Sequence, residues 1–92
     1  MTDEAQGAGW LARVVVTLKP VVNDPQGLAA TDGLHNLGYR DVDSTRIGKY
    51  IEVRLRAPDE VTARAQVDEI CRRLLSNPVI ENYRFDLSIE AP

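Results

Sequence analysis

The stretch "NYRFDLSIE", residues 82–90, alternates apolar and polar side chains without a break. Its apolar members share one parity: Tyr83, Phe85, Leu87 and Ile89. Because successive side chains of a strand point to opposite faces of a sheet, this pattern predicts a strand with one face on a core. Residues 13–19 and 50–56 alternate in the same way, so the sequence predicts a sheet of at least three strands.

The segment before this last strand has the spacing of a helix. Asp59 follows a proline and starts the segment, and its apolar residues recur at helical intervals: Ala63, Val67, Ile70 and Leu74. Acidic residues near its start and arginines near its end match the helix dipole. Pro78 marks its end, because the residue before a proline avoids helical geometry.

A second helix is predicted to begin at "DPQG". Asp24 can cap it, and Pro25 suits a first position at which a backbone N–H is not needed. Its apolar stripe consists of Ala30, Leu34 and Leu37. Gly38 stands where a left-handed residue ends a helix. Gly27 and Gly33 each disfavour a helix by roughly 1 kcal/mol relative to Ala, so each needs a reason such as close backbone approach.

The second strand contains a glycine that predicts a bend. Gly48 lies within "RIGKYIE", so residues 45–56 form one kinked strand or two short strands. Lys49 has the parity of the apolar residues around it. It either extends its amine past the sheet edge or is turned to solvent by the bend.

The order strand, helix, strand, helix, strand predicts an α+β domain. Right-handed crossovers would place both helices on one face of an antiparallel sheet, as a two-layer ferredoxin-like sandwich. The open sheet face is then a candidate surface for a homodimer, with Val15 and Tyr50 on it. Residues 1–10 are predicted to be a flexible leader and residues 11–92 a single domain.

Composition argues against several classes of function. The chain has 11 basic and 14 acidic residues, a formal net charge of −3, so no nucleic-acid partner is expected. One histidine, His35, and one cysteine, Cys71, do not supply a zinc site. The sequence has neither a signal peptide pattern nor a run of about 20 apolar residues. We therefore expect no membrane partner and a cytoplasmic location.

Residues for catalysis are not evident in the sequence. His35 has no nucleophile near it in sequence, and the serines lack a nucleophile-elbow context. Neither phosphate-loop pattern occurs. We expect no catalytic, cofactor or metal site on this chain. The most unusual polar group is the basic pair Arg46 and Lys49 beside the bend at Gly48, which could reach an anion or an acidic partner.

Four segments together carry a resemblance to a known family. They are "DPQG", "LHNLGY", "RIGKYIE" and "CRRLLSNPVIENY", in this order and spacing. The chain resembles the PurS family, the small subunits of phosphoribosylformylglycinamidine (FGAM) synthase, from about Arg13 to Ile89. A match of "DPQG" alone would carry little weight, whereas four segments in register are specific.

The resemblance implies a role in assembly within purine biosynthesis. In that family a large synthetase subunit (PurL) binds ATP, with magnesium, and formylglycinamide ribonucleotide, and a glutaminase subunit (PurQ) releases ammonia from glutamine. The small subunit, a homodimer or tetramer, bridges the two and supports ammonia transfer, without a catalytic site or cofactor of its own. The complex is an ATP-dependent ligase that converts the formyl amide to an amidine.

The same resemblance suggests where partners would bind. The start of the "DPQG" helix offers free amides, and the "RIGK" segment offers positive charge at a bend. The partner-contact candidates are Asp24, Gln26, Gly27, Arg46, Gly48 and Lys49. Capping and strand bending explain several of them equally well. Two other functions fit the same element order: an ACT-like small-molecule regulatory domain, and an RNA-binding sandwich, which needs paired aromatics on its central strands.

Overall fold

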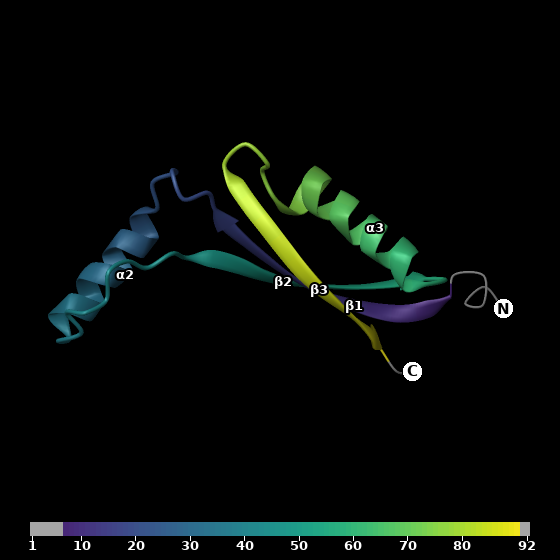
Figure 1. Cartoon of the computed structure of the whole chain (residues 1–92), viewed down its shortest axis with the longest axis horizontal. Helices are drawn as coiled ribbons and strands as arrows, with labels where there is room; N and C mark the ends of the chain where they lie inside the picture. Colours follow the sequence, from purple (N-terminus) through teal and green to yellow (C-terminus); the bar gives the residue numbers. More distant parts are fainter. Residues whose placement is uncertain (1–6, 91–92) are drawn as a thin grey trace.

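The computed structural model describes residues 7–90, which form a three-stranded antiparallel sheet and two α-helices (Figure 1). The elements in chain order are β1 (Ala8–Leu18), α2 (Pro25–Asn36), β2 (Gly48–Ala57), α3 (Glu60–Ile70), η1 (Cys71–Leu75) and β3 (Glu81–Glu90). The predicted α+β class, the strand and helix order and the antiparallel sheet are confirmed. α2 has the predicted cap at Asp24, and Asp59, predicted at the start of the other helix, is the N-cap of α3.

The sheet has β1 at its centre, between β2 and β3. Val14 lies opposite Ile51 on one side and Phe85 on the other, which sets one continuous apolar row across the three strands. β2 is a single strand that begins at Gly48, so residues 45–47 are not part of it. β1 begins at Ala8, inside the segment predicted as a leader, while residues 1–6 of that segment lie outside the described residues.

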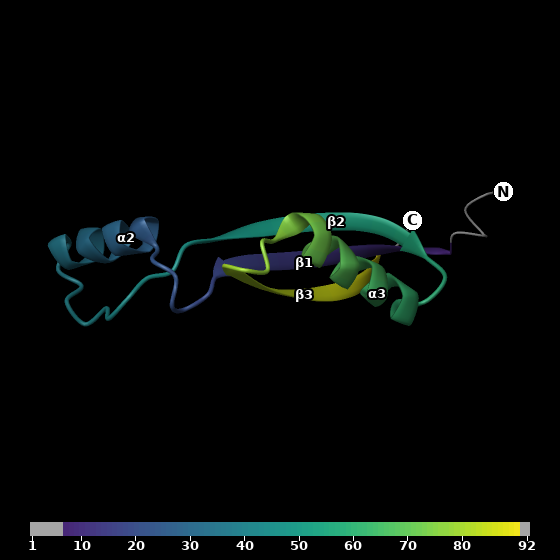
Figure 2. The same ribbon diagram turned by 90° about the horizontal axis from the view of Figure 1, so that it is seen from above.

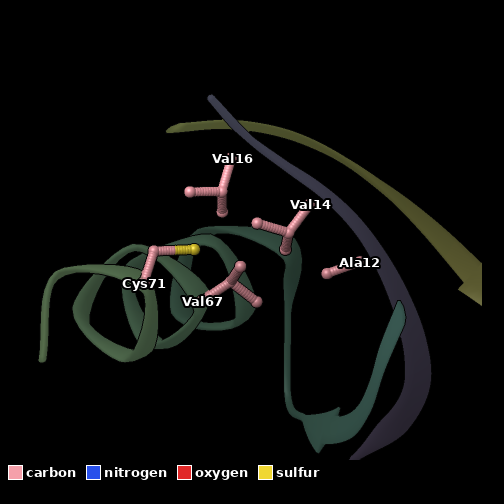
Figure 3. Close-up of a cluster of buried hydrophobic side chains, with 5 residues drawn as sticks. All are labelled: Ala12, Val14, Val16, Val67 and Cys71. Carbon is pink, nitrogen blue, oxygen red and sulfur yellow. The ribbon is translucent and has the colours of Figure 1, made fainter. Parts of the chain in front are cut away.

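The core is small and lies between α3 and β1. Figure 3 shows Val67 and Cys71 of the helical segment pointing toward three side chains of the central strand. These strand residues, Ala12, Val14 and Val16, are at most 1% exposed. All five core side chains are small, so the helix can pack closely on the sheet. The loss of any one of these side chains therefore removes a large share of the packing in the core.

A π-helical turn at the end of α3 changes which residues face the core. Leu74 was predicted on the buried stripe, but it is exposed, whereas Cys71, three residues earlier, is buried as expected for a small apolar side chain in this helix. In η1 the Ser76 amide donates to the Cys71 carbonyl five residues back, at 3.0 Å. The wider turn rotates Leu74 outward relative to an α-helix.

The prediction that both helices cover one face of the sheet is wrong. α3 lies over the sheet, whereas α2 projects beyond the end where β1 stops and β2 starts (Figures 1 and 2). The molecule is therefore elongated, 58 × 28 × 15 Å, with a radius of gyration of 17.6 Å. A compact chain of this length would have about 12 Å. We call α2 and the loop that follows it, residues 25–47, the arm.

Candidate partner-binding site

The base of the arm is held by the carboxylate of Asp24. One oxygen accepts the amide of Gly27 at 2.9 Å and caps α2, and the other accepts the amide of Ile47 at 2.9 Å. The side chain is 5% exposed. Asp24 therefore fastens the start of the arm helix to the residue that leads into β2, a role that helix capping alone would not predict.

Arg46 closes the same junction from outside. Its Nη2 atom lies within hydrogen-bond distance of three backbone carbonyls, those of Leu18, Lys19 and Val22, at 3.3, 2.9 and 3.1 Å. Its Nε is 3.9 Å from the Asp24 carboxylate. The guanidinium thus holds the turn after β1 to the loop before β2. We call Asp24, Gly27, Arg46 and Ile47 the latch.

Two glycines at the junction are required by close contacts. A Cβ on Gly27 would lie 2.2 Å from the Thr45 carbonyl oxygen, and one on Gly48 would lie 2.4 Å from the Val16 carbonyl oxygen. Both distances are far below van der Waals contact, so these positions exclude any side chain. The sequence alone did not explain why a glycine occupies position 27 within a helix. The structure gives the reason, which is the close packing of α2 against the loop before β2.

Four of the six partner-contact candidates line one hollow at the junction. Its volume is about 250 Å³. The lining residues are Val16, Leu18, Asp24, Gln26, Ile47, Gly48, Lys49 and Glu81. The Lys49 amine is 4.0 Å from the Glu81 carboxylate of β3, so the side chain reaches across the central strand β1, and it is 60% exposed. Sequence reasoning missed Glu81, because nothing about the first residue of a strand signals a charge partner.

The residues predicted for a dimer on the open face do lie there. Val15 pairs with Tyr50 across β1 and β2, and Tyr50 is exposed. The face around them is charged: Arg13 pairs with Asp86 at 3.3 Å, and Tyr50 donates to Glu52 at 2.8 Å. Their use in a dimer stays a prediction.

The two residues with the most familiar chemistry have structural roles. His35 Nε2 is 2.8 Å from the Val42 carbonyl, where a ring N–H ties α2 to the arm loop. Cys71 is buried, and burial raises the pKa of its thiol, which lowers its reactivity. Within residues 7–90 no cluster of three or more histidine, cysteine or acidic side chains is placed to hold a metal ion. No described helix is long and apolar enough to cross a membrane.

The pKa of Asp24 is lowered by the amides of Ile47 and Gly27 and by the charge of Arg46. A carboxylate with a lowered pKa stabilises the folded chain above its unfolded pKa near 3.8, and this contribution is lost as pH falls through the lower folded value. We expect the melting temperature of the wild type to fall more steeply below about pH 4 than that of Asp24→Asn. Thermal melts from pH 7 to pH 3 measure this.

Asp32→Asn, an exposed carboxylate on the same helix, serves as the control. It should keep the acid sensitivity of the wild type. Equal acid profiles for the wild type and Asp24→Asn would show that the latch carboxylate does not contribute.

Fold and junction together define a small three-stranded α+β domain with one helix on the sheet and one on a projecting arm. The family model of PurS, phosphoribosylformylglycinamidine (FGAM) synthase, matches residues 11–89. The chain belongs to the PurS family, and so to the FGAM synthase subunits of purine biosynthesis.

Relatives and solved structures agree with this assignment. The PurS subunit of Synechocystis sp. is 55% identical over 76 residues, which span 83% of this chain and 76% of the relative. The crystal structure of Bacillus subtilis PurS matches with a TM-score of 0.75 and 40% identity, covering 86% of this chain and 98% of that one. A chain in the structure of PurLQS from Thermotoga maritima matches with a TM-score of 0.73 and 27% identity, over 88% and 98%.

Proposed function

We propose that this chain is the non-catalytic small subunit of a cytoplasmic FGAM synthase, where it bridges the synthetase subunit (PurL) and the glutaminase subunit (PurQ). The observation that supports this most directly is the match to a chain in the structure of PurLQS from Thermotoga maritima. The match covers 98% of that Thermotoga maritima chain. The junction hollow supports it as well, because it presents the largely exposed basic side chain of Lys49 beside the carboxylate of Glu81.

The bridge has a chemical purpose in this proposal. Glutamine hydrolysis releases ammonia at one active site, and the ligase consumes it at another to convert a formyl amide to an amidine. Ammonia that escapes into water is diluted and protonated, so fixing the two sites relative to each other raises the fraction that reacts. ATP and magnesium belong to the complex and bind on PurL. Residues of this chain position its partners and take no part in the bond changes.

A homodimer, alone or paired into a tetramer, is part of the proposal. The elongated shape supports it, because a 92-residue chain folded as one compact body would bury its arm helix against its sheet. Here the arm helix projects away from the sheet. A second copy is a natural source of the missing contacts.

Reconstitution tests the bridging role. Glutamine-dependent amidine formation by the two larger subunits should fall at least about tenfold when this chain is omitted, and it should return when the purified chain is added. Activity with ammonium salt in place of glutamine should change much less, because added ammonia needs no coupling to the glutaminase. An unchanged glutamine-dependent rate, with an unchanged mass of the complex, would contradict the bridge.

A charge reversal in the junction hollow sharpens this experiment. Lys49→Glu should weaken assembly with the larger subunits while the isolated chain keeps its melting temperature, because the lysine side chain is largely exposed. Arg40→Glu, an exposed residue outside the hollow, is the matched control and should assemble normally. Loss of folding in Lys49→Glu would assign the lysine to structure, and normal assembly would remove it from the contact site.

A further inference from the structure

Two turns with the same sequence pattern lie side by side at one end of the sheet. Residues 19–22 read Lys-Pro-Val-Val and follow β1, and residues 77–80 read Asn-Pro-Val-Ile and lead into β3. In each, the fourth amide donates to the first carbonyl, at 2.9 Å in residues 19–22 and at 3.1 Å in residues 77–80. The Lys19 amide also donates to the Ile80 carbonyl at 2.8 Å, so the turns are joined directly. We call these two segments the Pro-Val turns.

The third position of each Pro-Val turn holds a valine that lies almost wholly in solvent. Val21 is 93% exposed and Val79 is 79% exposed. Turn geometry explains the prolines at the second positions, but it does not explain a valine, which neither fixes the turn nor bonds to its backbone. A single exposed apolar residue is common on a protein surface, whereas two valines beside two prolines on joined turns form an apolar patch. The patch points to a surface outside this chain that packs against it.

Polar contacts hold both turns in shape before any partner binds. The Arg46 guanidinium donates to the first and the last carbonyl of residues 19–22. In the other turn the Asn77 side chain accepts the amide of Val79 at 3.1 Å, and the Asn77 amide donates to the Glu81 carboxylate at 2.7 Å. A surface that is already fixed in its bound shape loses little conformational entropy on binding. The two valines are therefore presented as rigid apolar anchors.

The charge around the patch is basic, although the whole chain has a net charge of −3. The chain has two lysines, Lys19 and Lys49, and both lie at this end of the sheet. The Lys19 amine makes no ion pair or hydrogen bond with the residues that the structure describes. Lys49 faces Glu81, but the glutamate side chain is only 17% exposed, so the lysine charge is the outer one. A complementary surface is therefore apolar at its centre and carries carboxylates at its rim.

We infer that the Pro-Val turns bind a larger subunit of the proposed FGAM synthase through a surface of this chemistry, which covers Val21 and Val79 and brings carboxylates to Lys19. The inference rests on the proposed function and adds a contact surface to it. That surface is continuous with the junction hollow, because Leu18 and Glu81 line the hollow and directly flank the two turns. Figures 1 and 2 show both turns at the end of the sheet from which the arm projects.

Reconstitution with variants of the patch tests this inference. The measured quantity is the concentration of this chain that restores half of the glutamine-dependent amidine formation by the two larger subunits. Val21→Glu and Val79→Glu should each raise it at least about tenfold, because each places a charge in an apolar contact. Both variants should keep the wild-type melting temperature, because both side chains are exposed. Val61→Glu changes a valine of α3 that is also 79% exposed, and as the matched control it should behave like the wild type.

Two further variants test the chemistry of the contact without a buried carboxylate. Val79→Thr keeps the size and branching of valine, so the turn is preserved, and it should raise the half-restoring concentration about threefold through the added hydroxyl. Lys19→Glu should raise it about tenfold, with a larger effect at low salt than at high salt, because it reverses a charge at the rim. An unchanged value for Lys19→Glu would contradict the acidic rim of the partner surface.

Sedimentation of the chain with PurL alone and with PurQ alone then identifies the subunit that the patch binds. If Val21→Glu and Val79→Glu restore activity at the wild-type concentration, the inference is wrong while the proposed bridging role stands. It is also wrong if Val61→Glu weakens restoration as much as they do, or if they change only the mass of the isolated chain, which would assign the patch to a second copy. A wild-type chain that restores no activity overturns the proposed function and this inference together.

Discussion

Gly27→Ala is expected to unfold α2 while the sheet stays folded. The added methyl would lie 2.2 Å from the Thr45 carbonyl and 2.8 Å from the Asp24 carboxylate, so helix and loop must separate. Overpacking of this kind costs about 3 kcal/mol. An isolated helix of 12 residues is marginal in water, and the described arm makes its main contacts with its own loop. The latch is therefore what keeps the arm helical.

Circular dichroism and amide NMR can report separately on the helices and on the sheet. The α-helices have 12 and 11 residues, so the ellipticity at 222 nm should fall by about half while amide signals of β1 and β3 persist. Gln26→Ala, one residue away and exposed, is the control and should leave the spectrum unchanged. A normal spectrum for Gly27→Ala would mean that the loop before β2 can move without loss of the helix.

The strands and the helix ends were predictable because their signals are local. Alternation in residues 82–90 and the cap at Asp24 depend on side-chain direction and on the first amides of a helix, and both are properties of neighbouring residues. Gly38 ends α2 with a positive φ of 102°, as its position in the sequence predicts. These features would be the same in any tertiary arrangement.

The position of α2 was not predictable from the same signals. An apolar stripe shows that a helix has a side to bury, but it does not say which surface covers that side. The decisive contacts join residues far apart in sequence, such as Asp24 with Ile47 and Arg46 with Leu18. The alternation of apolar and polar residues along the chain does not reveal these long-range contacts. The expectation of two helices on one face failed for this reason.

In the candidate site, too, some residues could be identified from the sequence and others only from the tertiary structure. Gln26, Gly48 and Lys49 were identified from motifs, and the fold brings them to one hollow. Glu81 completes that hollow from the start of β3, and only the tertiary pairing of Lys49 with it reveals this. The rotation of Leu74 out of the core was hidden as well, because a π turn changes the period that the stripe assumes.

Val67→Asp is expected to unfold α3 and the sheet together. Val67 is fully buried against β1 and is one of two helical residues in a core of five small side chains. A carboxylate there would lose its hydration without gaining a partner, a penalty of several kcal/mol. The total stability of a domain of this size is roughly 5–14 kcal/mol. Amide signals of β1 should collapse to the narrow range of an unfolded chain.

Two further variants separate the buried charge from the loss of packing. Val67→Ala should remain folded and lose about 2 kcal/mol in urea unfolding, because it leaves a cavity and no charge. Gln66→Asp places the same carboxylate on the adjacent, exposed position and should change stability little. If Val67→Asp folds like Gln66→Asp, the contact of α3 with β1 does not hold the sheet, and the stability of the domain must come from another surface. If instead it unfolds the sheet, while Gly27→Ala removes only α2, then core and arm are separate cooperative units joined at the latch.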